Sequence, residues 1–346
     1  MGRDFHISLR VTRRGAAKPS AIQVKQTDDG LHLANSILWF DAQSSGDLSF
    51  LSSATQVFNP RVPQVIATEE TIKILEAHRK KPHALICQYN RPFSIGRLKM
   101  ELLPSGAVLG GASLYVETDK GRLLYAPQLQ PHRIPTVRQM QLKRANTLVL
   151  GVAHPDPTVS MPNRKKEKDR LLETVQALVA QGLAPVILTE PVGTAQEVTK
   201  LLTEHGTAVA VHDTIFKVNN VYEAYGSKLG DFTRFTKKHS KQKVTIFPLP
   251  TKRGAPLPAS LPADQPLLAV EPTAEETVPL TAFRQGSARF HVASTCDGPE
   301  IKEIVAAVNP KEVYLFGPYA KRYVDELASL GPVIRPLFVN DQPTLF

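Results

Sequence analysis

The chain has 346 residues, of which 42% are hydrophobic and 21% charged, so an intrinsically disordered protein is excluded and one elaborate or two ordinary domains are expected. Its formal charge of +10 favours a polyanionic partner, nucleic acid first, although a basic surface is also common in proteins that bind none. Two widely separated cysteines exclude a disulfide framework, and no apolar run reaches the length of a membrane span.

The N-terminal half of the chain shows the patterns of successive strands. A basic segment, 1–19, comes first and lacks the apolar core of a signal peptide, so we expect a cytoplasmic protein. The sequence ETIKILEAHRKK (70–81) has apolar residues at helical spacing and predicts a helix whose last residues are cationic. The predicted strands are 21–26, 31–41, 48–54, 64–70, 83–89, 95–103, 112–118, 121–127 and 147–152.

The second half alternates helices and strands, which predicts a parallel sheet. The helices are expected at 163–182, 194–206, 299–310 and 319–331. The strands are expected at 184–190, 207–213, 288–294 and 312–318. The segment 249–281 is rich in proline, alanine and threonine, and predicts an extended excursion with one strand in LLAVEP.

Several short segments resemble, in the same order, the motifs of one family. LLPSGAVLGGAS (102–113) is similar to the PxGHxLGSA motif of the metallo-β-lactamase fold, in the β-CASP branch of nucleases. PVILTEPVGTAQEVTKLL (185–202) resembles the β-CASP element FALGRAQE. FHVASTCDGPEIKEI (290–304) and NPKEVYLFGPYAKRYVDEL (309–327) are similar to its two C-terminal motifs, and the resemblance runs from about residue 20 to 340.

The resemblance implies an α/β fold, a metallo-β-lactamase-like αββα sandwich with an inserted β-CASP-like α/β cap. The sandwich would comprise residues 20–172 and 288–346, and the cap residues 173–287. The nearest members would be bacterial exonuclease-like proteins associated with DNA ligase or with mRNA 3′-end processing.

The residues that bind two zinc ions in this family are absent. The metal-binding loop of the family corresponds to residues 53–58, and Gly151 occupies the position of a supporting acidic residue. No two histidines of the chain are separated by a single residue, so the HxH spacing of the family occurs nowhere. The ligand positions hold Ser53, Thr55, Val57, Phe58, Ala107, Gln128 and Thr295, and only Asp297 is retained.

We therefore predict no bound metal, no cofactor and no catalytic residue. Loop 53–58 should lean towards Ala107 and Gln128, with Val57 and Phe58 filling the space of the metals. The alternative is a rebuilt metal site among His132, His154, Asp156 and His291, although exposed or hydrogen-bonded polar residues explain these side chains as well. Cys296 is a candidate nucleophile, but a buried small side chain is the favoured interpretation.

Two basic segments are candidates for nucleic-acid binding. In the first, Phe232 and Phe235 alternate with cations, a pattern that fits a single-strand channel. A solvated surface is the alternative for both segments. Their cations are Arg234, Lys237, Lys238, Lys241 and Lys243 in the first, and Arg138, Lys143 and Arg144 in the second.

The sequence thus predicts a pseudonuclease that serves as a scaffold or nucleic-acid-binding subunit in DNA repair or RNA processing. The excursion 249–281 and the apolar tail 334–346 could contact an active nuclease, a helicase or a ligase, or the tail could dock as the last strand of its own sheet. A metal-dependent nuclease with a relocated site and a pure protein-interaction module are the alternatives. DNA or RNA as ligand, the partner and the oligomeric state stay open.

Overall fold

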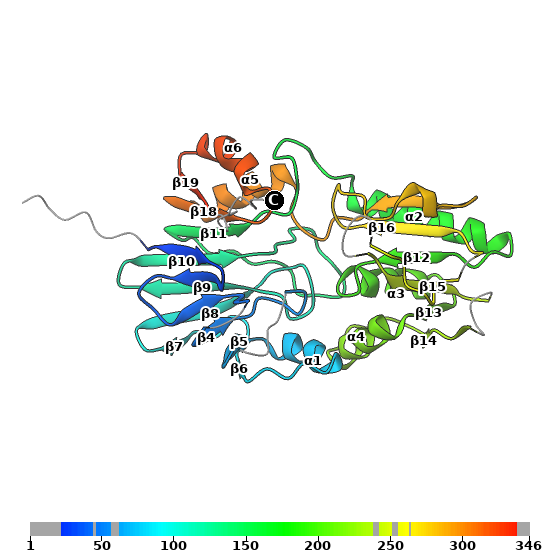
Figure 1. The fold of residues 1–346 in the computed structure, drawn as a ribbon, viewed down its shortest axis with the longest axis horizontal. Coiled ribbons are helices and arrows are strands. Elements are labelled where there is room, and N and C mark those ends of the chain that lie inside the picture. Colours follow the sequence, from blue (N-terminus) through cyan, green and yellow to red (C-terminus); the bar gives the residue numbers. More distant parts are fainter. Residues whose placement is uncertain are drawn as a thin grey trace, which may run out of the picture.

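The computed structural model describes residues 22–43, 46–56, 62–237, 242–250, 255–262 and 264–337. The chain is mixed α/β, as predicted, and it forms three sheets (Figure 1). Within the described residues, none of the helices has the length and apolar character needed to cross a membrane.

The first sheet has six strands in the order β1-β2-β3-β4-β5-β6. The expected strand 31–41 is wrong as a single element, because Asn35 adopts a left-handed conformation (φ 61°) and turns the chain back, so that β2 and β3 pair antiparallel. The elements are β1 Val24–Thr27, β2 Gly30–Leu33, β3 Leu38–Phe40, β4 Leu48–Phe50, β5 Val65–Ala67, helix α1 Glu69–Ala77 and β6 Ala84–Ile86.

The second sheet has seven strands in the order β19-β18-β11-β10-β9-β8-β7, parallel from β19 to β10 and antiparallel from β10 to β7. The described part of the tail docks as a last strand, since β19 pairs with β18. The strands are β7 Phe93–Ile95, β8 Leu98–Pro104, β9 Ala112–Thr118, β10 Gly121–Ala126, β11 Thr147–Gly151, β18 Glu312–Phe316 and β19 Val333–Pro336. The helices that follow the third sheet in sequence are α5 Gly298–Val308, η3 Ala320–Tyr323 and α6 Val324–Ala328.

These two sheets pack face to face and carry helices on their outer faces. Phe40 and Phe50 of the first sheet meet Tyr125 of the second in one buried core. α1 covers the other face of the first sheet through Ile72 and Leu75. α5 and α6 cover the other face of the second sheet. The layers therefore run helix, sheet, sheet, helix, and we call this part the sandwich lobe.

The third sheet is parallel throughout, with the order β14-β13-β15-β12-β16-β17, as the alternating pattern predicts. We call the elements from α2 to β17 the insert lobe, because they lie between the neighbouring strands β11 and β18 of the second sheet. The elements are α2 Arg164–Ala180, β12 Val186–Thr189, α3 Thr194–Glu204, β13 Val209–Val211, α4 Asp213–Ala224, β14 Phe232–Arg234, β15 Val244–Pro248, β16 Leu267–Glu271, η2 Leu280–Ala282 and β17 Ala288–His291.

The two faces of the third sheet are covered in different ways. Helices α2 and α3 pack on one face, where Leu171, Val198 and Ile246 belong to one buried cluster. The other face is covered by the excursion, whose Leu249, Leu257 and Val278 pack on it, and β16 is its one described strand, within the predicted LLAVEP. The predicted division between residues 172 and 173 falls inside α2, and β17, after the predicted division at 287, belongs to the third sheet.

Several other elements differ from expectation. α1 ends at Ala77, because Arg79 adopts a left-handed conformation (φ 62°), so the cationic residues 79–81 follow the helix instead of ending it. β7, α4, β14 and β15 are additional elements that the sequence patterns above do not predict.

Candidate functional site

Three of the positions that the resemblance equates with metal ligands, Ser53, Thr55 and Gln128, meet at one end of the two packed sheets. Ser53 Oγ lies 2.7 Å from Thr55 Oγ1, and the Thr55 hydroxyl donates to Gln128 Oε1 at 3.2 Å. Residues 53–56 therefore lean towards Gln128 as predicted, while Val57 and Phe58 lie outside the described residues. Ala54 packs beside Ala107. A chain of hydroxyl and amide groups thus occupies this end of the sheets.

The glycine-rich loop 105–111 is held close to the strand end that carries Gln128. Gly106 has a φ of 79°, and a Cβ there would lie 2.3 Å from the backbone oxygen of Gln130. Gln130 N donates to Ser105 O, which fixes the loop against this segment. Ala107, 2% exposed, packs with Ile74 of α1 in an apolar cluster between the lobes. The methyl group of Ala107 therefore contributes to the packing of this cluster.

The segment 293–297 closes the same end, but its reactive groups are already engaged. Cys296 donates to Leu129 O at 3.1 Å, and burial raises the pKa of its thiol well above its ordinary value, which does not suit a nucleophile. Asp297 caps α5: it accepts from Glu300 N at 3.0 Å and from Met161 N at 2.8 Å. Thr295, which precedes Cys296, is partly buried.

The histidines proposed for a rebuilt metal site have separate partners. His132 pairs with Glu300 at 2.6 Å, His154 contacts Asp156 O at 3.0 Å, and His291 contacts Thr273 O at 3.1 Å. Over the described part of the chain, no three His, Cys, Asp or Glu side chains gather as metal ligands would.

A cavity of about 510 Å³ lies between the lobes beside this end. Its walls are largely apolar and include Ala54, Leu75 and Val192, with Thr55 and Glu190 among the polar groups. Burial raises the pKa of Glu190, while hydrogen bonds from Ser294 and Thr194 oppose the shift. The cavity can hydrogen-bond a ligand, and Glu190 is a group that the motif comparison missed, although it ends the predicted strand 184–190.

The first basic segment lies at the edge of the third sheet. Arg234 pairs with Asp213 at 2.5 Å, and Lys243 donates to Thr233 Oγ1 at 3.1 Å. Lys237 is exposed, and Lys238 and Lys241 lie outside the described residues.

The two phenylalanines of this segment pack on other aromatic rings of the insert lobe. Phe232 packs edge-on against Phe216 at a centroid distance of 5.8 Å, and Phe235 packs edge-on against Phe247 at 4.8 Å. Both rings are partly buried, on opposite faces of the third sheet, because residues three apart in an extended chain point to opposite sides.

The second basic segment has contacts in the sandwich lobe. Lys143 pairs with Glu101 at 2.6 Å and lies over the Tyr115 ring, and Arg138 lies over the Tyr89 ring at 5.4 Å. Arg144 is exposed. Arg138 also lines a hollow together with Lys200 and Lys228 of the insert lobe.

The lobes are joined at this site by a buried tyrosine. Tyr222 of α4 is fully buried, and its hydroxyl accepts a hydrogen bond from Leu109 N at 2.9 Å, from α4 to the glycine-rich loop. Sequence patterns did not single it out, because the contact joins residues 113 positions apart.

Replacing Tyr222 by phenylalanine is expected to lower the free energy of unfolding by about 1–3 kcal/mol, because the buried Leu109 N–H is left without an acceptor. Denaturant-induced unfolding measures this. Tyr319→Phe, at a partly exposed position, is the control and should change stability by less than about 0.5 kcal/mol. Equal effects of the two variants would contradict the assigned hydrogen bond.

No known family description and no curated protein matches this sequence. Among solved structures, the chain is similar to a protein of unknown function from Enterococcus faecalis V583, with a TM-score of 0.57 and 12% identity, over 84% of this chain and 79% of that chain. At this identity the likeness concerns the fold alone.

Proposed function

We propose that this protein is a catalytically inactive relative of the β-CASP nucleases of the metallo-β-lactamase fold, and that it binds nucleic acid as a scaffold or accessory subunit in DNA repair or RNA processing. The contact between Thr55 and Gln128 carries the proposal. The two residues are 73 positions apart, and only the motif resemblance relates them, as former ligands of one metal centre. If the family motifs were aligned with the wrong residues of this sequence, a contact between these two side chains would not be expected.

The chemistry of this end of the sheets supports the loss of activity. Zinc is bound in proteins by thiolates, imidazoles and carboxylates, and a metal-activated hydroxide requires such ligands. The corresponding positions here offer the neutral oxygens of Ser53, Thr55 and Gln128, and Ala107 offers no donor atom. The retained carboxylate, Asp297, is used as a helix cap.

The architecture supports the family part of the proposal. The layer order helix, sheet, sheet, helix and an inserted lobe with a parallel sheet are what the resemblance implies. The nucleic-acid part rests on the formal charge of +10, because phosphate neutralisation and counterion release drive such binding.

The test measures metal content, cleavage and binding on the purified protein. We expect substoichiometric zinc and no cleavage of single-stranded DNA or RNA with Zn²⁺ or Mn²⁺. We also expect binding of labelled oligonucleotides, with the logarithm of the affinity falling linearly as the logarithm of the salt concentration rises. One zinc ion per chain with cleavage would instead favour a relocated metal site. An absence of binding even at low salt would favour a protein-interaction module.

A further inference from the structure

Two adjoining hollows lie where α1, α4 and the segment 134–138 meet, apart from the positions of the former metal ligands. The first, of about 610 Å³, lies between α1 and α4, and the second, of about 480 Å³, lies beside it against the sandwich lobe. Tyr225 lines both hollows, and we call them together the Tyr225 groove.

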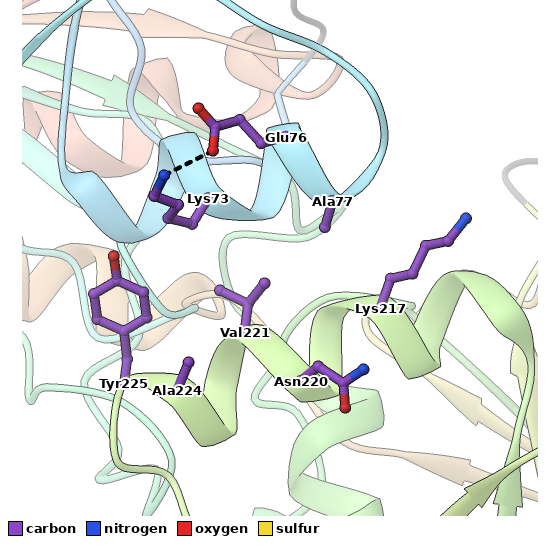
Figure 2. A pocket seen from close by; sticks show the side chains of 8 residues that line it. All are labelled: Lys73, Glu76, Ala77, Lys217, Asn220, Val221, Ala224 and Tyr225. Atoms are coloured by element: carbon purple, nitrogen blue, oxygen red, sulfur yellow. Dashed lines mark hydrogen bonds and ion pairs between the residues drawn. The ribbon is translucent and has the colours of Figure 1, made fainter.

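The floor of the first hollow is apolar and its edges are cationic. Figure 2 shows Val221, Ala224 and Tyr225 of α4 facing α1, with Lys73 above them and Lys217 at the far end of the groove. From Lys217 to Tyr225 the helix rises roughly 12 Å. The hollow thus offers an elongated apolar surface with positive charge at both ends.

The second hollow continues this charge. Its lining includes Arg138, Lys200 and Lys228, against the single carboxylate of Glu70. Lys200 donates to the backbone oxygen of Lys228 at 2.8 Å, so the Lys200 ammonium lies against the chain at Lys228. Across both hollows, five cations stand against two lining carboxylates, Glu70 and Glu76.

Three of these lysines form ion pairs that are weak enough for a ligand to replace. Lys73 pairs with Glu76 at 2.8 Å, Lys217 with Asp213 at 2.9 Å and Lys200 with Glu204 at 2.6 Å. All three are local helix pairs with at least one solvent-exposed partner, and such pairs contribute only about 0.3–0.5 kcal/mol. A phosphate group can therefore replace the carboxylate at little cost.

The Tyr225 ring packs against the apolar cluster between the lobes, which holds it in place, and it also lines both hollows. Burial raises the pKa of Tyr225 to about 12, and the charges of Glu69, Glu70 and Glu76 act in the same direction. The side chain is partly exposed, and among the described residues no aromatic ring stacks on it, in contrast to Phe232 and Phe235. A fixed aromatic ring beside cations is the arrangement on which single-stranded bases stack.

We propose that the Tyr225 groove binds single-stranded nucleic acid, with a base stacked on Tyr225 and the adjacent phosphates on Lys217 and Lys228. This proposal rests on the proposed function and replaces the edge of the third sheet as the main binding surface. An acidic peptide would use the same lysines but would gain little from the ring, which separates the two ligands experimentally.

The experiment measures the fluorescence anisotropy of labelled oligo(dT) and oligo(U) over a range of salt concentrations. Tyr225→Ala should weaken binding by about 5- to 100-fold, the loss of one base–aromatic stack, whereas Tyr225→Phe should retain it. The double variant Lys217→Gln with Lys228→Gln should reduce the slope against salt by about 2. The matched control, Arg234→Gln with Lys243→Gln, removes the same charge from the edge of the third sheet and should have the smaller effect.

The outcomes are distinguishable. If the wild-type protein binds and the Tyr225 groove variants bind equally well, the groove is wrong while the proposed function stands. If a poly-glutamate peptide competes as effectively as oligo(dT) and Tyr225→Ala has no effect, the groove takes acidic peptides and the proposal is overturned. If the wild-type protein binds no oligonucleotide at low salt, both proposals fail.

Discussion

Replacing Glu197 by glutamine is expected to lower the free energy of unfolding by about 3–5 kcal/mol. Arg164 donates to both carboxylate oxygens of Glu197, at 2.7 and 2.5 Å, and Lys168 adds a third contact at 2.7 Å. Arg164 and Glu197 are only 6% and 4% exposed. The substitution therefore leaves a buried guanidinium without its counter-charge, which costs more than the ion pair itself contributes.

Two variants isolate this effect in denaturant unfolding. Arg164→Met with Glu197→Leu removes both charges and should recover most of the loss, because Lys168 is partly exposed and can be hydrated. Glu204→Gln breaks the exposed pair with Lys200 on the same helix and should cost less than about 0.5 kcal/mol. A Glu197→Gln variant as stable as Glu204→Gln would show that the ion pair is not buried in solution.

The same site has a pH dependence of known sign. Burial opposes the charge of Glu197, but the hydrogen bonds and charges of Arg164 and Lys168 outweigh it and hold the pKa of this carboxyl below its ordinary value. Its stabilising contribution is therefore present above the pKa of the unfolded chain and is lost on acidification.

Asp41 is expected to act in the opposite direction, by roughly 2 kcal/mol between pH 4 and pH 6. Burial raises the pKa of Asp41 from 3.8 to about 6, although Ser52 and Tyr125 donate hydrogen bonds that oppose the shift. The folded protein thus binds this proton more tightly than the unfolded chain does. The free energy of unfolding must then fall as the pH rises through this window.

The Asp41→Asn variant tests this by difference. Asparagine tolerates the left-handed conformation of this residue (φ 46°) and can still accept from Ser52 N, but it does not titrate. The stability of the wild type minus that of the variant should decrease by roughly 2 kcal/mol from pH 4 to pH 6 and level off above about pH 7. A difference that is flat over this range would contradict the raised pKa.

The elements that the sequence predicted well are those whose local signals agree with their packing. Helix α2 follows the cap Asn163 and buries Leu171, Val175 and Leu178 at helical spacing. Helix α4 was missed because its cap is His212 and because Asn219 interrupts its buried face, where it accepts a hydrogen bond from Gln196 at 2.9 Å. β15 was missed because it ends in a proline-rich segment, which reads as a loop.

The site was predictable to a similar, limited extent. The order of the motifs related Thr55 to Gln128, and the structure places them in contact. The Tyr225 groove and the Tyr222 hydrogen bond lie where the two lobes meet, and no local pattern reports which side chains face each other across such a junction. The spacing of Phe232 and Phe235 among the cations does not reveal that each ring packs on a different face of the third sheet.

The position of the insert lobe has a consequence for how the chain folds. β11 and β18 are hydrogen-bonded neighbours, yet residues 152–311 separate them, so their pairing closes a long loop whose entropy must be lost before the pairing is favourable. The start and the end of the insert lobe are hydrogen-bonded to each other, since Arg164 Nε of α2 donates to Ala293 O, just after β17, at 2.8 Å. Once the insert lobe has collapsed, its two ends are already adjacent and the remaining loop is short. The insert lobe should therefore fold before the second sheet is completed. The hydrogen bond between Arg164 and Ala293 forms when the insert lobe folds, and by holding its two ends together it speeds the pairing of β11 with β18.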